Sequence, residues 1–296
     1  MSAWERGRAG ELPDASSGKR GPEEGAVALK PEDAPEARRF FRQRTALIVG
    51  LAAGLVVVCA LCGAYTGFDL AGTVADAPEA LAWLVVNFTP DAESFEKTGQ
   101  IMRALLSTVM ASVSASTIAA VLAYVSAVIG SRSVGLGSGV SLVVRGIALV
   151  FRNIPVVAWA FILLFSFHQS EFTGFLALFL GSYGYLTRCF LENIDEVSGG
   201  PVEALRATGA SYPELIAQAV LPLTLTSVVS WTLYMVETNI RDATLVGILT
   251  GTGVGFVFSL YYRSFEYGDA GLVIAAVVIV VLACEGASNF VRRRII

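Results

Sequence analysis

The sequence predicts an all-α membrane protein with six transmembrane helices, and two observations carry that prediction. Hydrophobic residues make up 54% of the 296-residue chain and charged residues only 16%, with a mean hydropathy of +0.64. This composition is too apolar for a protein that buries its core against water. In addition, six apolar runs are long enough to cross a bilayer core, which needs roughly 20 helical residues. The runs are continuous rather than alternating, which favours helices over barrel strands.

The six predicted spans are residues 45–64, 101–129, 140–167, 174–192, 222–250 and 271–290. The second, third and fifth exceed one span, which predicts tilt or extension beyond the lipid. Ahead of them, residues 1–36 are rich in Gly, Pro, Ser and charge, so we expect a disordered cytoplasmic tail. Residues 37–97 hold the first span and an outer loop. In that loop the apolar stretch Ala80–Phe88 is expected either to lie along the outer membrane interface or to pack on the ends of the helices.

Basic residues predict the orientation of the spans. They gather before the first span, between the second and third, between the fourth and fifth, and after the sixth: Arg38, Arg39, Arg42, Arg44, Arg132, Arg206, Arg292, Arg293 and Arg294. Because cytoplasmic loops carry an excess of Lys and Arg, both termini and the loop after the fourth span are predicted to be cytoplasmic.

Cysteine and histidine usage predicts no metal site. Cys59 and Cys62 form a CxxC, but a structural zinc site needs about four ligands. His168 is the one histidine of the chain and is far from that pair in sequence. The cysteines lie in or beside apolar runs, where they behave as small hydrophobes.

The polar segment between the fourth and fifth spans has its own predicted structure. Gly209 with Ala210 breaks a helix, and Ser211 can cap a second one, with Glu214 at the third position after it completing a capping box. The second helix would end at Pro222, where the next span begins. A movement of this segment would therefore be transmitted directly to a membrane helix.

This segment resembles the EAA loop of the permease subunits of bacterial ABC importers. The residues EALRATG, followed nine residues later by AVLP, match that pattern at Glu203, Ala204, Gly209, Leu221 and Pro222. Leu205 and Ala219 depart from it, both by apolar replacement. Three stretches and an arginine-rich end widen the resemblance, over roughly residues 98–296, to the permeases of phosphonate importers. The stretches are FRNIPVVAWA, GPVEALRATGAS and ETNIRDATLVGILTGTGVG.

The resemblance implies a type I ABC importer permease (MetI-like) core over residues 98–296 with one extra N-terminal helix. It also implies a cytoplasmic coupling loop, residues 193–222, that docks on an ATPase. The residues expected to carry that docking are Glu203, Ala204, Leu205, Gly209, Ala210, Leu221 and Pro222. The implied partners are a second permease copy (homodimer), two ATP-binding cassette subunits and an extracytoplasmic protein that binds phosphonate or a related phosphorus oxyanion.

No cofactor is expected on this chain, and ATP and Mg²⁺ are expected on the partner ATPase. The sequence contains no GxxxxGK[ST] loop to hold ATP phosphates. The cluster Gly251, Gly253 and Gly255 is instead expected to form a turn in which backbone approaches backbone at the outer end of the pathway. A proton-coupled secondary transporter, or a membrane enzyme acting on phosphorylated compounds, is the alternative function.

Charges within the spans are the candidates for a translocation pathway, since a charge at bilayer depth is costly unless it is paired or faces water. Glu237 and Arg241 are four residues apart and can pair, either as a structural clamp or beside a pathway. Guanidinium geometry suits phosphoryl oxygens, and a proline within a span frees a carbonyl group. The candidate set is Arg152, Asn153, Pro155, Glu237, Asn239 and Arg241.

Two further predictions concern residues outside that set. Arg145 and Arg188 are expected to anchor at the cytoplasmic interface, where long basic side chains can reach water. The hydroxyl residues of the second span are expected to pack helices closely rather than to contact substrate. These hydroxyl residues are Ser107, Ser112, Ser114, Ser116 and Thr117.

Overall fold

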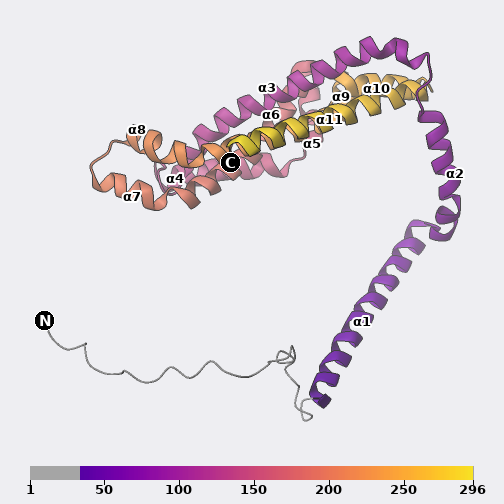
Figure 1. Ribbon diagram of the computed structural model, residues 1–296, viewed down its shortest axis with the longest axis horizontal. Coiled ribbons are helices and arrows are strands. Elements are labelled where there is room, and N and C mark those ends of the chain that lie inside the picture. Colours follow the sequence, from indigo (N-terminus) through magenta and orange to yellow (C-terminus); the bar gives the residue numbers. More distant parts are fainter. Residues whose placement is uncertain (1–33, 296) are drawn as a thin grey trace, which may run out of the picture. The chain divides into compact units, whose positions relative to one another are not determined.

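The computed structural model of the protein describes residues 34–295, and every regular element in that range is helical (Figure 1). The chain divides into two compact units, with the boundary between Ala77 and Pro78. The first unit contains α1 (Ala34–Thr66) and the beginning of α2 (Leu70–Phe88). The tail expected over residues 1–36 lies outside the described residues except for its last three, which begin α1.

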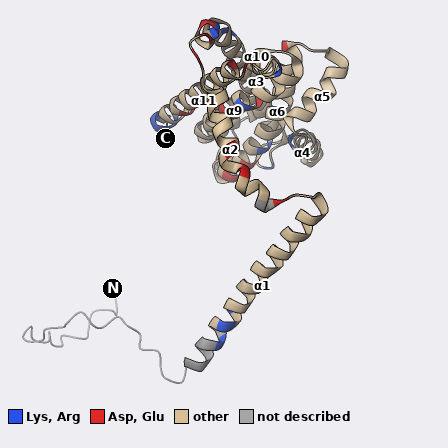
Figure 2. Ribbon diagram, turned by 90° about the vertical axis from the view of Figure 1, so that its right-hand side faces the viewer, with Lys and Arg blue, Asp and Glu red and all other residues tan. Residues whose placement is uncertain are grey.

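Helix α1 is longer than the predicted span, and its apolar side chains are exposed. Basic residues lie in its first turns, ahead of the apolar run, and a second basic group follows the apolar part of α11 (Tyr267–Ile295) (Figure 2). Lipid is the natural cover for such an apolar helix. The exposed surface of α1 is therefore consistent with a span rather than with a helix of a water-soluble core.

The second unit contains the rest of α2 and eleven further elements. They are η2 (Ser94–Lys97), α3 (Thr98–Gly130), α4 (Ser138–Asn153), α5 (Val156–Phe167), α6 (Glu171–Val197), α7 (Gly199–Ala207), α8 (Tyr212–Leu215), η3 (Ile216–Val220), α9 (Leu221–Thr250), α10 (Gly253–Arg263) and α11. Across both units, five described helices are long and apolar enough to cross a membrane, or six if α4 and α5 count together as one bent span.

The predicted third span, residues 140–167, is not one straight helix. It breaks between α4 and α5, whose axes differ by 93°. Pro155 explains the break, because proline has no N–H to donate and disfavours helical geometry in the residue before it. Ile154 accordingly has an extended conformation, with φ −90° and ψ 117°. The sequence predicted the interruption but not the size of the turn.

Helices α3, α6 and α9 form the centre of the second unit, and they pack through small and apolar side chains. Ala119, Ala123 and Phe190 are fully buried in one cluster. A side chain at Gly184 of α6 would lie 2.6 Å from the Cβ of Phe151 in α4, so that crossing requires glycine. Close approach through small residues is typical of membrane helices.

The loop of residues 65–100 contains α2 and η2 rather than an irregular chain. Within the second unit, the ring centroids of Trp83 and Phe88 each lie 5.5 Å from that of Tyr267. Lys97 forms ion pairs with Glu266, at 3.1 Å, and with Asp269. The stretch Ala80–Phe88 thus packs against the beginning of α11, which is the second of the two arrangements expected for it.

The glycine cluster after α9 forms the tight turn that was predicted. Gly251 and Gly253 have φ of +68° and +61°, which L-residues rarely adopt. A Cβ on Gly255 would lie 1.9 Å from the carbonyl oxygen of Thr244. Glycine at this position therefore lets α10 approach the backbone of α9.

Candidate functional site

The coupling loop folds as two short helices at one end of the second unit, and α10 lies towards the opposite end (Figure 1). Helix α7 ends in a Schellman motif. The N–H of Gly209 donates to the Arg206 carbonyl at 3.0 Å, and that of Ala210 donates to the Leu205 carbonyl at 3.3 Å. Gly209 has φ +84°, which suits glycine. The predicted break between the helices is therefore a defined turn.

The second helix begins as the capping box predicted. The N–H and hydroxyl of Ser211 both donate to the carboxylate of Glu214, at 2.6 and 2.8 Å. From Tyr212 the chain continues as one helical segment of 39 residues through α8, η3 and α9. The coupling loop thus leads into a candidate span without a break.

Pro222 lies within this continuous helix, and a π-helical turn accommodates it. In η3 the N–H of Leu221 donates to the carbonyl of Ile216, five residues back rather than four. A proline in a regular helix would clash with the carbonyl of the fourth residue before it, here Gln218. The wider turn relieves that conflict. Sequence reasoning placed a helix end at Pro222 and missed the π turn.

The residues expected to dock on an ATPase differ in exposure. Those that match the EAA pattern are exposed: Glu203, Ala204, Gly209, Leu221 and Pro222. The two departures from the pattern face inward instead. Leu205 is half-buried against the core cluster, and Ala219 is 3% exposed within it. These two replacements therefore concern internal packing of the loop.

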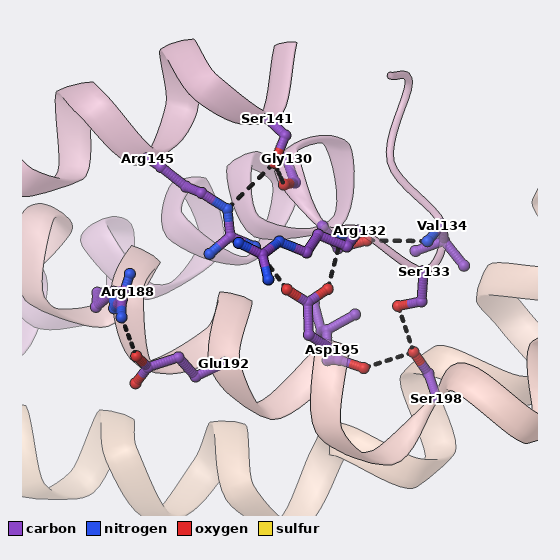
Figure 3. Close-up of polar contacts among 12 residues, drawn as sticks. Gly130, Arg132, Ser133, Val134, Ser141, Arg145, Arg188, Glu192, Asp195 and Ser198 are labelled. Carbon is purple, nitrogen blue, oxygen red and sulfur yellow. Dashed lines mark hydrogen bonds and ion pairs between the residues drawn. The ribbon is translucent and has the colours of Figure 1, made fainter. Parts of the chain in front are cut away.

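Two polar contacts attach the coupling loop to the loop between α3 and α4. Arg206 donates to the carbonyl of Ser133 at 3.0 Å. The hydroxyls of Ser133 and Ser198 are hydrogen-bonded at 2.9 Å (Figure 3). Val202 of α7 is also buried, with 1% exposure. The first helix of the coupling loop is therefore fixed to the bundle by the apolar side chains of Val202 and Leu205 and by two polar contacts.

The carboxylate of Asp195, near the end of α6, links that helix to α4 and to the loop between α3 and α4. One oxygen accepts from the backbone N–H of Arg132 at 2.7 Å, and the other forms an ion pair with Arg145 at 2.5 Å (Figure 3). Arg145, which is expected to anchor at the cytoplasmic interface, ties α4 to α6 through this pair. Arg188 pairs with Glu192 within α6. No local sequence pattern indicated the role of Asp195, because its partners are distant in the chain.

The predicted pathway residues of α4 lie at its break with α5. Arg152, Asn153 and Pro155 are exposed in the single chain. The amide of Asn153 donates to the carbonyl of Leu149, in its own helix, at 2.7 Å. Arg152 has no hydrogen bond or ion pair with any described residue. Its guanidinium group is thus available to a ligand or to another chain.

The predicted pathway residues of α9 divide into a pair and a buried amide. Glu237 and Arg241 form the expected ion pair at 3.0 Å, with side chains 14% and 49% exposed. Asn239 is fully buried, and its amide donates to the hydroxyls of Ser116 and Ser182 at 2.8 and 2.7 Å. The structure thus places the Asn239 side chain of α9 against both α3 and α6. Arg241 is more exposed and lies on the face it shares with Glu237.

The bundle of candidate spans, with an exposed helix pair continuous with one of them, defines the membrane-spanning subunit of a transporter. Residues 119–292 match the family described as binding-protein-dependent transport system inner membrane component. That match covers more than half of the chain, so the protein belongs to this family of ABC importer permeases and is a multi-pass protein of the inner membrane.

Relatives in this family carry names that refer to phosphorus compounds. The chain is 27% identical to the phosphate-import permease protein PhnE of Mycolicibacterium smegmatis, over 69% of this chain and 38% of that protein. It is 32% identical to the putative cryptic phosphonate transport system permease protein PhnE2 of Escherichia coli, over 41% of this chain and 99% of that protein. The chain therefore spans well under half of the mycobacterial relative.

A third relative and two solved structures agree with this class. The phosphite transport system permease protein PtxC of Stutzerimonas stutzeri is 28% identical, over 65% of this chain and 70% of that protein. The MetNI methionine ABC transporter, in an inward facing conformation, has a chain that matches with a TM-score of 0.56 and 19% identity, over 67% of this chain and 98% of that one. An amino acid ABC transporter matches with a TM-score of 0.57 and 19% identity, over 70% of this chain and 99% of that one. At this identity the solved structures support the fold alone.

Proposed function

We propose that the protein is the permease subunit of an ATP-driven importer that translocates phosphonate or a related phosphorus oxyanion, such as phosphite or phosphate. A binding protein would deliver the substrate, and a separate ATPase would drive the cycle through the coupling loop. One observation carries the proposal. The exposed helix pair of the coupling loop is continuous with α9, the helix that holds Glu237 and Arg241.

The continuity gives a physical route from ATP hydrolysis to the pathway. A partner that pushes on exposed Glu203 and Ala204 moves α7, and the Gly209 turn passes that movement to α8. A hydrogen-bonded helix resists bending, so α9 then tilts as one body with the residues it carries. ATP and Mg²⁺ belong to the partner in this scheme.

The arginines support assembly with a second copy. Arg152 and Arg241 are exposed on the single chain, and in a membrane an exposed guanidinium facing lipid would be costly. A second permease copy would cover these side chains and enclose a polar path between the two subunits. We therefore propose a homodimer over two ATPase subunits, with the pathway lined by Arg152, Asn153 and Arg241.

The basic residues support the proposed orientation of that assembly. They gather at the start of α1 and the end of α11, and Arg132 and Arg206 lie by the coupling loop. By the positive-inside rule these ends face the cytoplasm. The proposal counts α4 and α5 as one bent span, giving six spans with both termini inside.

Two variants of the coupling loop test the function. Glu203→Lys reverses a charge on the exposed surface of α7, and Gly209→Pro forbids the positive φ of the turn. Both are expected to abolish uptake of phosphonate, phosphite and phosphate by cells that express the whole transporter. Capture of substrate by the binding protein should stay unchanged, because that protein is separate.

Glu79→Lys is the matched control, since Glu79 is an exposed carboxylate of α2 outside the coupling loop. It should leave uptake intact. Normal uptake in the two coupling-loop variants would refute the proposal. So would uptake by proteoliposomes that contain this chain alone, without ATP, which is the result expected of a proton-coupled carrier.

A further inference from the structure

A cavity of about 380 Å³ lies beside the loop that joins α3 to α4, and none of its lining residues belongs to the predicted pathway. Arg132 of the loop and Ser138, Leu142 and Arg145 of α4 line it. Its volume is within the range of small-molecule sites, which begins at about 300 Å³. The proposed orientation puts the cavity at the cytoplasmic end of the bundle.

The cavity carries a surplus of positive charge. The side chains of Arg132 and Arg145 extend towards one another near the carboxylate of Asp195 (Figure 3). Each oxygen of Asp195 already accepts one hydrogen bond, one from Arg145 and the other from the backbone N–H of Arg132. Only the guanidinium of Arg145 pairs with Asp195, so the positive charge of Arg132 has no paired carboxylate among the described residues.

Hydrogen-bond donors also outnumber acceptors there. The hydroxyl of Ser141 accepts from Arg145 at 3.1 Å and donates its one proton to the Gly130 carbonyl at 2.7 Å. The guanidinium of Arg132 and the hydroxyl of Ser138 have no partner among residues 34–295. No side chain caps the first-turn amides of α4. What the cavity lacks is a set of acceptors with negative charge.

We propose that this cavity binds a phosphate-type oxyanion, either free inorganic phosphate or the headgroup of an anionic phospholipid. A guanidinium group binds phosphoryl oxygens through parallel N–H donors, and Ser138 and the α4 amides add further donors. Exposed Leu142 beside the arginines offers an apolar surface of the kind that a lipid chain would cover. The inference does not depend on which compound the transporter carries.

The position of the cavity connects it to the coupling loop. Ser133, the residue after Arg132, accepts from Arg206 and bonds to Ser198. An anion that holds Arg132 and the start of α4 would therefore stabilise the loop on which α7 rests. Occupancy is expected to increase the resistance of the α7 region to proteolysis.

Binding to purified full-length protein tests the proposal. One arm measures inorganic phosphate by calorimetry in detergent, and the other measures retained lipid by native mass spectrometry after reconstitution in phosphatidylglycerol or phosphatidylcholine. Arg132→Gln is expected to weaken binding of the probe by about tenfold or more, since it removes a charge-assisted contact. Arg103→Gln, at an exposed arginine of α3 outside the cavity, should bind as the wild type does.

Two further variants distinguish binding in the cavity from binding in the transport pathway and from misfolding. Arg241→Gln separates the cavity from the transport pathway, because phosphate binding that survives it belongs elsewhere. Ser138→Ala removes an exposed hydroxyl and should weaken binding by about threefold. This variant replaces Arg132→Gln as the test if Arg132→Gln does not fold, as judged by loss of its helical circular dichroism. If Arg132→Gln or Ser138→Ala loses the binding of inorganic phosphate, the free anion is the ligand. If these variants lose only the retained phosphatidylglycerol, the ligand is the lipid headgroup.

The proposal fails if the wild type retains neither probe, or if Arg132→Gln and Ser138→Ala bind both as the wild type does. It also fails if Arg132→Gln changes only the association with a partner ATPase. That outcome would assign Arg132 to an acidic protein surface.

Discussion

Arg206 in α7 donates a hydrogen bond of 3.0 Å to the carbonyl oxygen of Ser133, which lies 73 residues earlier in the chain. The same serine bonds through its hydroxyl to Ser198, where α6 gives way to α7. The first helix of the coupling loop is thus held at both of its ends by one short loop. Any force on α7 acts on α3 and α4 as well as on α9.

Replacing Arg206 by Met should weaken coupling without unfolding the protein. The side chain keeps its length but loses its donors, and an exposed hydrogen bond of this kind contributes about 1 kcal/mol or less. Uptake is expected to fall by about fivefold, the change in a two-state population that corresponds to about 1 kcal/mol. Arg263→Met, at an exposed arginine of α10, is the control. Equal uptake in the two variants would contradict the contact's role.

Asp195→Asn should destabilise the end of α6. Arg145 and Asp195 are only 19% and 21% exposed, so the pair is partly shielded from solvent. The amide keeps an acceptor but leaves Arg145 without its countercharge, at a cost of about 1–3 kcal/mol. The expected result is a lower thermal unfolding midpoint in detergent. Glu196→Gln, at the exposed neighbouring carboxylate, should not lower it, and a similar decrease in both variants would refute this account.

Asn239→Ala should loosen the packing of α3, α6 and α9. The fully buried amide bonds to Ser116 and Ser182, and the variant leaves both hydroxyls without that donor. Buried polar bonds between membrane helices average under about 1 kcal/mol each, so a loss of about 1–2 kcal/mol is expected. Unfolding in denaturing detergent measures it, with Asn153→Ala as the exposed control. A stability equal to that of the control would show that the amide does not bind the helices together.

Gly255→Ala and Gly146→Ala should change stability in opposite directions. A Cβ at Gly255 would meet the Thr244 carbonyl at 1.9 Å, whereas nothing lies within 4 Å of one at Gly146. The first substitution forces α10 away from α9, at a cost of about 1–3 kcal/mol. The second replaces an exposed glycine in α4 and should stabilise the helix by roughly 0.5–1 kcal/mol. Thermal midpoints that move in the same direction would disagree with the described turn.

Features set by neighbours in the chain were predictable from the sequence. The apolar runs predicted the long helices, because continuous apolarity over some 20 residues has few other uses. The capping box of Ser211 and Glu214 and the break at Gly209 were also predicted, since both depend on residues within three positions. The Glu237 and Arg241 pair follows from the same local geometry, at helical spacing.

Contacts between distant residues could not be predicted in the same way. Asp195 lies 50 residues from Arg145, and Asn239 lies 123 residues from Ser116, so no local pattern links either pair. The break at Pro155 could be predicted only in part. Proline chemistry predicts a break, but the 93° turn depends on how α5 packs against α6 and α9. The π turn before Pro222 is a local feature, but a regular α-helical pattern does not predict it.

The uninterrupted helix from Tyr212 to Thr250 also has a mechanical consequence. Its 39 residues correspond to a rod of roughly 58 Å at 1.5 Å per residue. Rotating such a rod about one end by a single degree displaces the other end by roughly 1 Å, by simple trigonometry applied to that length. A rotation of a few degrees at the ATPase surface would therefore move the far end by about the radius of an oxyanion. In the proposed importer, the length of this helix sets how far its far end moves for a given rotation at the coupling loop. Inserting residues between Tyr212 and Glu237 should therefore change the size of that movement as well as the helical register.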